Sequence, residues 1–169
     1  QHMYKKWRGR SAENVVDEID ELMRTHGIDK YYFADCSFED PGPDLSRMKQ
    51  IAEKILEREL NISYLADFRA EISRKLDEET ISLLKKSGLR CVFIGIEAAN
   101  EEDLILYRKR AKVDDNHNIL IKLFISFIYS SYLSIIINGK NPRANGIYNF
   151  IHILMSLKQF IAWALWITF

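Results

Sequence analysis

The sequence predicts an α/β fold built from alternating strands and helices, with the strands parallel. Three short apolar runs each lead into a carboxylate residue, and these acids are Asp35, Asp67 and Glu97. They stand 32 and 30 residues apart, and the chain between them has helical periodicity. Strands joined by helical crossovers lie parallel, so their carboxyl ends meet at one rim of a β/α barrel or an open sheet. Because ligands bind at that rim in both architectures, we expect the three acids to face one site.

The first helix and strand have clear local signals. Residues 11–26 place apolar side chains on one helical face, with Ser11 suited to cap the helix and Gly27 suited to end it. A strand follows over 28–35. The next segment, residues 36–43, is polar, rich in proline and glycine, and long for a strand-to-helix connection. Loops of this kind often contribute to a site.

The later elements repeat the pattern of helix and strand. In order they are a helix over 45–56, a strand over 62–66, a helix from Asp77 to Gly88, a strand over 90–96 and a helix that begins after Asn100. Asp77 and Asn100 have the short polar side chains that cap helices, and acidic residues follow each of them.

Charge is distributed unevenly along the chain. All 24 acidic residues lie at or before Asp115, whereas the residues from His117 onward carry four basic residues and no acidic one. The net charge is zero and no basic stripe is visible, so we expect no nucleic-acid partner. Cys36 and Cys91 are too few and too far apart for a disulfide framework, and we expect them to be small core residues. With no secretory signal at the start of the sequence, a cytoplasmic setting is expected.

Several motifs in order give the chain a family resemblance. They are Arg-Ser-Ala-Glu-Asn-Val-Val-Asp-Glu-Ile at 10–19, Phe-Ala-Asp-Cys-Ser-Phe at 33–38, Phe-Ile-Gly-Ile-Glu-Ala at 93–98, and Asp-Leu with a later tyrosine at 103–107. Over residues 8–116 the chain resembles radical S-adenosylmethionine (SAM) enzymes, closest to the branch with an upstream cobalamin-binding domain. This resemblance implies a partial (β/α)6 barrel of the TIM type, incomplete, with strands two to four and their helices.

The resemblance also implies roles for the strand-end residues. Glu97 would lie near the ribose or methionyl part of bound SAM, and Arg69 could pair with a carboxylate through two parallel donors. Asp35 and Asp67 would face the same cavity. The implied chemistry is reductive cleavage of SAM by a [4Fe-4S] cluster, which starts radical chemistry on an unknown small-molecule substrate, with cobalamin as a further cofactor of this branch. No catalytic residue and no metal ligand of this chain is assigned.

The chain departs from the family at the cluster. Radical SAM enzymes hold the cluster with three cysteines in a C-x3-C-x2-C loop, which this sequence lacks. Residues 1–8 resemble the segment just downstream of that loop. We therefore expect a fragment whose partner is a missing N-terminal segment or domain of the same enzyme. As given, it should bind neither the cluster, SAM nor cobalamin stably, and should be inactive.

Residues 117–169 form a second segment of apolar composition, which follows the barrel-like segment at 1–116. Ile119–Ile137 and 147–169 approach the length of a membrane helix. Their polar residues recur on one helical stripe, however, which favours packed helices, or one face at a membrane surface, over a membrane-spanning segment. In the family this region would hold a fifth strand, and residues 134–142 are a degraded version of it. A diverged barrel, an out-of-frame reading and a membrane segment all remain open.

Two other functions also remain open. In a metal-dependent β/α-barrel lyase, Asp35, Asp67 and Glu97 would bind a divalent cation, since hard carboxylate oxygens suit such ions. In a non-catalytic remnant or binding module, an exposed edge strand would pair with another chain.

Overall fold

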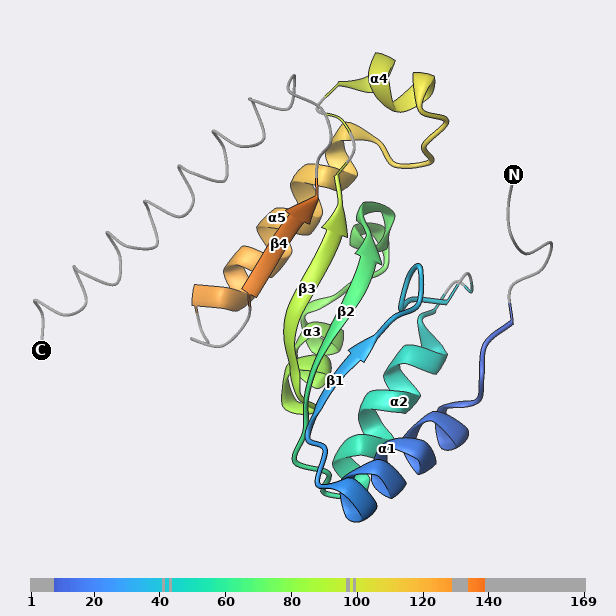
Figure 1. Ribbon diagram of the computed structural model, residues 1–169. Coiled ribbons are helices and arrows are strands. Elements are labelled where there is room, and N and C mark those ends of the chain that lie inside the picture. Colours follow the sequence, from blue (N-terminus) through green and yellow to red (C-terminus); the bar gives the residue numbers. More distant parts are fainter. Residues whose placement is uncertain are drawn as a thin grey trace, which may run out of the picture.

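A parallel sheet of four strands, in the order β1-β2-β3-β4, organises the chain (Figure 1). The computed structural model describes residues 8–40, 42, 44–96, 98, 100–128 and 134–138, with side-chain environments as far as Leu123. The strands are β1 (Lys30–Phe33), β2 (Ser63–Arg69), β3 (Leu89–Gly95) and β4 (Ser134–Asn138). All three pairings are parallel, as the sequence predicts for strands joined by helices. This confirms the α/β fold class.

The helices begin and end largely where the capping residues indicate. They are α1 (Ala12–His26), α2 (Ser46–Glu57), the 3-10 helix η1 (Ala70–Arg74), α3 (Glu78–Lys86), α4 (Glu101–Leu106) and α5 (Val113–Ile128). Ser11, Asp77 and Asn100 each accept a hydrogen bond from a backbone N–H in the first turn of their helices. Gly27 ends α1 in the left-handed conformation, at φ 66°. The 3-10 helix η1 has no counterpart among the predicted elements.

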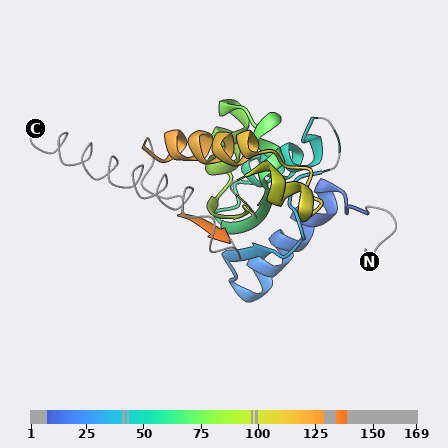
Figure 2. The ribbon, with the colours of Figure 1, turned by 90° about the horizontal axis from the view of Figure 1, so that it is seen from above.

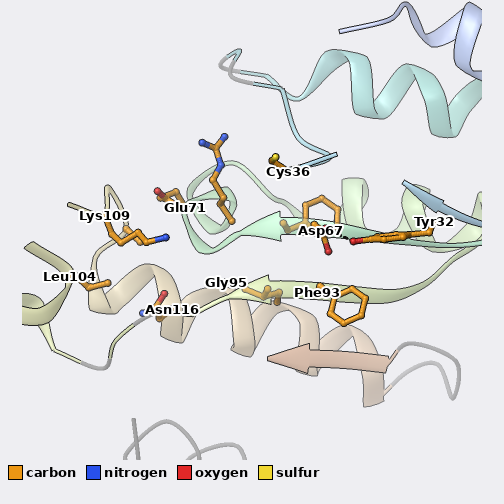
Figure 3. A pocket seen from close by; sticks show the side chains of 13 residues that line it. Tyr32, Cys36, Asp67, Glu71, Phe93, Gly95, Leu104, Lys109 and Asn116 are labelled. Carbon is orange, nitrogen blue, oxygen red and sulfur yellow. Dashed lines mark hydrogen bonds between the residues drawn. The ribbon is translucent and has the colours of Figure 1, made fainter. Parts of the chain in front are cut away.

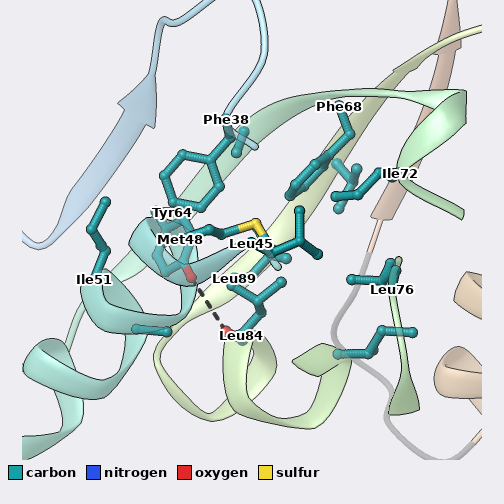
Figure 4. Close-up of a cluster of buried hydrophobic side chains, with 14 of the residues drawn as sticks. Phe38, Leu45, Met48, Ile51, Tyr64, Phe68, Ile72, Leu76, Leu84 and Leu89 are labelled. Carbon is teal, nitrogen blue, oxygen red and sulfur yellow. Dashed lines mark hydrogen bonds between the residues drawn. The ribbon is translucent and has the colours of Figure 1, made fainter. Parts of the chain in front are cut away.

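One face of the sheet carries the hydrophobic core. Helices α1, α2, α3 and α5 lie along this face (Figures 1 and 2). Every second residue of β2 points into the core, and these are Tyr64, Ala66 and Phe68. Figure 4 shows the centre of this core, where Phe38, Met48 and Leu84 surround the aromatic ring of Tyr64. The buried hydroxyl of Tyr64 lies 2.8 Å from Ser87 Oγ, and burial raises the pKa of this tyrosine.

The opposite face of the sheet is more open. Side chains alternate along a strand, so Leu65, Asp67 and Arg69 of β2 lie on the face away from the core helices. The predicted second strand ended near Ala66, whereas β2 continues to Arg69. Asp67 therefore lies within the strand rather than at its end. The expectation that each strand closes on its acid is thus wrong for β2.

The charge boundary near residue 116 falls inside one helix. Helix α5 spans Val113–Ile128, and Ile119, Leu120 and Leu123 join the same core as the earlier elements. Beyond it, β4 pairs with β3 where the sequence predicted a degraded strand. In the part of the chain that the structure describes, no helix has both the length and the apolar character needed to cross a bilayer. The second membrane candidate, 147–169, lies outside the described residues.

Candidate functional site

A cavity of about 520 Å³ opens at the carboxyl ends of β2 and β3 (Figure 3). Its wall comes from the open face of β1, β2 and β3, from η1, and from the segment that joins α4 to α5. This volume is within the ordinary range for small-molecule sites. The rim that the sequence predicted as the ligand-binding edge therefore does hold a cavity.

Tyr32 and Asp67 form one side of the cavity. The Tyr32 hydroxyl donates a hydrogen bond of 2.7 Å to Oδ2 of Asp67. This bond raises the pKa of Tyr32, with burial and the charge of Asp67 adding to the effect. Phe93 lies opposite Asp67 in the β2–β3 register, and its ring centroid is 6.3 Å from that of Tyr32. The site thus combines a negative charge with two aromatic rings.

Arg69 adds a positive charge, and a buried carboxylate holds it. Its Nε donates a hydrogen bond of 2.9 Å to Oε1 of Glu39. The Glu39 side chain is only 4% exposed, whereas that of Arg69 is 51% exposed. An ion pair of this kind fixes the guanidinium while its outer nitrogens stay accessible to a ligand.

The loop over 36–43 reaches the site from β1. Its buried residue Phe38 donates a backbone hydrogen bond of 2.8 Å to the carbonyl of Asp67, which holds the loop against β2. The loop supplies Glu39 to Arg69 and Cys36 to the cavity wall. Cys36 is exposed and Cys91 is half-buried, so the expectation of two core cysteines is wrong for Cys36. The reason is that Cys36 stands on the bend after β1, outside the strand.

The far side of the cavity comes from α4 and α5, and the sequence analysis missed it. Asn116, in the first turns of α5, lines the cavity and donates through Nδ2 to the carbonyl of Ala98 at 2.9 Å. The neighbouring Asp115 accepts a hydrogen bond of 2.7 Å from Nε of Arg74, which fastens α5 to η1. A single asparagine within a helix has no sequence pattern that marks it as a site residue.

The structure brings together two of the four residues predicted to bind a cofactor. Asp67 and Arg69 both line the cavity. Asp35 is exposed on the loop after β1 and is not part of the cavity wall. Glu97 lies outside the described residues. The cofactor roles of all four residues remain predictions.

The described residues do not provide a site for an iron–sulfur cluster. Such a cluster needs several thiolate ligands, and Cys36 and Cys91 are the only cysteines of the sequence. Among the described residues, no group of three His, Cys, Asp or Glu side chains is placed to hold a metal ion. The cavity itself suits a small polar ligand, because charged and aromatic side chains converge on it.

Comparisons with known proteins agree with the predicted resemblance. No family model matches the chain. The anaerobic magnesium-protoporphyrin IX monomethyl ester cyclase of Rubrivivax gelatinosus is 29% identical over 114 residues, which is 67% of this chain and 20% of the cyclase. An uncharacterized methyltransferase of Pyrococcus horikoshii is 31% identical over 96 residues, covering 57% of this chain and 20% of that protein.

Solved structures of radical SAM enzymes share the fold of this chain. The cobalamin-dependent SAM radical enzyme OxsB, with aqua-cobalamin bound, superposes on 82% of this chain with a TM-score of 0.63 and 26% identity, and the match covers 20% of OxsB. The radical SAM methyltransferase TsrM from Kitasatospora setae shares the fold, with a TM-score of 0.57 at 20% identity over 75% of this chain and 23% of TsrM.

The chain spans about a fifth of the length of these relatives. OxsB, at 26% identity, is a cobalamin-dependent SAM radical enzyme, in agreement with the resemblance of the motifs at 10–19, 33–38 and 93–98. The chain is therefore homologous to part of an enzyme of that kind.

Proposed function

We propose that this chain forms part of the SAM-binding barrel of a cobalamin-dependent radical SAM enzyme. The observation that carries the proposal is the 520 Å³ cavity on the open face of the sheet, with Asp67 and Arg69 in its wall. A carboxylate accepts hydrogen bonds from ribose hydroxyls or an amino group, and a guanidinium pairs with the methionyl carboxylate. SAM carries all three of the groups that these side chains would bind: the ribose hydroxyls, the amino group and the methionyl carboxylate.

The proposed enzyme needs more than this chain. When bound, the [4Fe-4S] cluster supplies the electron that cleaves SAM, and its ligands would come from a separate cysteine loop. Cobalamin would bind a further domain of the same enzyme, and the substrate would be a small molecule of unknown identity. The role of the residues described here is to bind and orient SAM and to exclude water from it. A reducing, cytoplasmic setting suits such chemistry.

The binding part of the proposal is tested with S-adenosylhomocysteine, a stable analogue of SAM. Equilibrium dialysis of the full chain should detect weak binding, in the millimolar range, that SAM competes away. D67N should weaken binding by about tenfold, the effect expected for one lost charge-assisted hydrogen bond. D29N is the matched control, because Asp29 is exposed at the opposite ends of the strands. Equal binding by wild type and D67N would contradict the proposal.

The inactivity of the chain is tested separately. Anaerobic incubation with iron, sulfide and a thiol should give no stable [4Fe-4S] absorption band, and dithionite with SAM should give no 5′-deoxyadenosine. A stable cluster in the full chain would contradict this part, whatever the result of the dialysis experiment.

A further inference from the structure

The outer face of helix α4 exposes two adjacent apolar side chains. Ile105 is 73% exposed and Leu106 is 70% exposed, and Tyr107, at 48%, follows them directly. No other large apolar side chain in the described part of the chain is more than 52% exposed. Ile105 and Leu106 do not line the cavity, so this face is separate from the candidate site. Contiguous apolar surface bordered by charged residues is typical of a place where another surface binds.

Helix α4 is fixed at both ends, so these side chains are held in place. Asn100 caps its first turn. At the other end, the backbone N–H of Arg108 donates to the carbonyl of Ile105 at 2.9 Å. The N–H of Lys109 donates to the carbonyl of Leu104 at 2.9 Å, and Arg108 takes the left-handed conformation at φ 54°. These two bonds form the Schellman motif, a common end of helices. Leu104, which is 1% exposed, anchors the inner face of α4.

The charge of this segment changes sign along its length. The first turn of α4 is acidic at residues 101–103, whereas residues 108–110 are all basic and exposed. Ile105 and Leu106 lie between the two groups. Glu102 stands four residues before Leu106, so the carboxylate and the apolar side chain share the exposed face of the helix. The face therefore has an acidic end, an apolar middle and a basic end.

We infer that this face binds the same face of a second copy of the chain, through an antiparallel contact of two α4 helices about a two-fold axis. A two-fold interface needs a surface that is complementary to itself. When one α4 is reversed against another, the apolar middles meet and each acidic end faces a basic end. Glu102 of one copy then lies near residues 108–110 of the other. Figure 1 shows α4 beyond the carboxyl ends of β2 and β3, away from α1, α2 and α3.

The order of charges favours a second copy over a lipid surface. An anionic membrane would attract the basic end of the segment but repel the acidic first turn. In the antiparallel dimer both ends contribute favourably. The contact area is small, because α4 is only 6 residues long. Interfaces below about 1,200 Å² are weak, so we expect a dimer with a Kd of about 100 µM.

The first test measures the size of the full chain by sedimentation equilibrium. Between about 5 and 500 µM, the wild type should pass from monomer to dimer. I105S/L106S should weaken the dimer more than tenfold, because it removes the apolar middle of the interface. I28S/L56S is the matched control, since Ile28 and Leu56 are also exposed, at 40% and 38%, but lie outside α4. This control should keep the Kd of the wild type.

The second test exchanges charges. E102R and R110E should each weaken the dimer by about tenfold, because an attraction becomes a repulsion at two symmetry-related positions. The double variant E102R/R110E reverses both signs and should return the Kd to within about threefold of the wild type. Added NaCl should weaken the wild-type dimer, since exposed charges are screened.

The inference has several ways to fail. A monomer at every concentration would overturn it, and so would a dimer that I105S/L106S leaves unchanged or that I28S/L56S weakens equally. Binding to phosphatidylglycerol vesicles that requires Ile105 and Leu106, with no dimer in solution, would assign the face to a lipid surface instead. Urea unfolding should be the same for all variants. If I105S/L106S is destabilised, the charge exchange decides, and failure of E102R/R110E to restore the dimer overturns the antiparallel contact.

Discussion

The hydroxyl of Tyr32 lies 2.7 Å from a carboxylate oxygen of Asp67, although 35 residues separate them in sequence. The bond joins two neighbouring parallel strands on the open face of the sheet, where neither side chain is needed for the core. An exposed tyrosine and an aspartate can be exchanged for other polar residues without loss of packing. Because the pair lies in the cavity wall, the proposed function predicts that it contributes to ligand binding.

Removal of the Asp67 charge should change the titration of Tyr32. The hydrogen bond to Asp67 raises the Tyr32 pKa above its ordinary value of 10.0, so D67N should lower the pKa toward that value. In the wild type the bond is present below that ordinary value and is lost as the pH rises through the higher pKa of the folded state. NMR of 13C-labelled tyrosine, with Y32F to assign the signal, measures the shift. D29N should leave the Tyr32 pKa unchanged.

Replacement of Arg69 should affect only ligands that carry a carboxylate. R69Q removes the charge that we expect to pair with the methionyl group, so binding of S-adenosylhomocysteine should weaken by about tenfold or more. Adenosine lacks the carboxylate, and its binding should not change. E39Q should weaken S-adenosylhomocysteine binding less, because the guanidinium remains but loses its buried partner. Both ligands are measured by equilibrium dialysis, and an equal loss for the two would contradict this role of Arg69.

Alanine at position 88 should strongly destabilise the fold. Gly88 has φ +112°, and a Cβ there would lie 2.3 Å from the carbonyl oxygen of Ile62. Since backbone cannot move aside as a side chain can, we expect G88A to cost more than about 2 kcal/mol in urea unfolding. Gly27 gives the matched control, because its φ is +66° but no atom lies within 4 Å of the added Cβ. G27A should cost about 1 kcal/mol. Equal losses in the two variants would show that the contact with Ile62 is unimportant.

The ion pair between Arg74 of η1 and Asp115 of α5 should make the stability of the fold depend on pH in the acid range. Burial would raise the pKa of Asp115, but hydrogen bonds from Arg74 and from the backbone of Lys112 together lower it below its ordinary value of 3.8. The carboxylate therefore stabilises the fold above that value, and the contribution is lost as the pH falls toward the lower folded-state pKa. D115N should cost about 1–3 kcal/mol at pH 7, measured by urea unfolding.

Urea unfolding of wild type and D115N at low pH tests whether the charge of Asp115 causes the difference in stability. The difference between wild type and D115N should shrink as the pH falls through the lowered pKa of Asp115, because protonation then removes the charge of the wild-type side chain. D114N is the control, because Asp114 is exposed in the same helical turn. A difference that stays constant from pH 7 down to the acid limit at which the wild type still folds would rule out the charge of Asp115 as its cause.

Elements with strong local signals could be predicted from the sequence. Ser11, Asp77 and Asn100 cap helices because their side chains bond nearby backbone, and such contacts depend on only a few neighbouring residues. The apolar run that became β2 was also found, but its end was not. Arg69 continues the strand because it faces the open side of the sheet, where a polar residue is as acceptable as an apolar one.

The site was less predictable because it depends on contacts between distant segments. Asp67 could be named because it follows an apolar run at the ligand-binding rim, and Arg69 because the family resemblance implied a role for it. Glu39 was not named, since its contact with Arg69 depends on how the loop over 36–43 folds back onto β2. Asn116 was missed for the same reason, because its contact with Ala98 joins two elements that share no sequence pattern.

The position of α5 has a practical consequence for any shortened version of this protein. Composition alone would suggest a cut near residue 116, where the acidic residues end. That cut would remove Ile119, Leu120 and Leu123 from the core, and would also take away Lys122, whose Nζ donates to the carbonyls of Ser73 and Leu76. A shortened protein meant to retain ligand binding would therefore have to include α5 at least as far as Leu123, because this helix supplies both a wall residue of the cavity and part of the hydrophobic core.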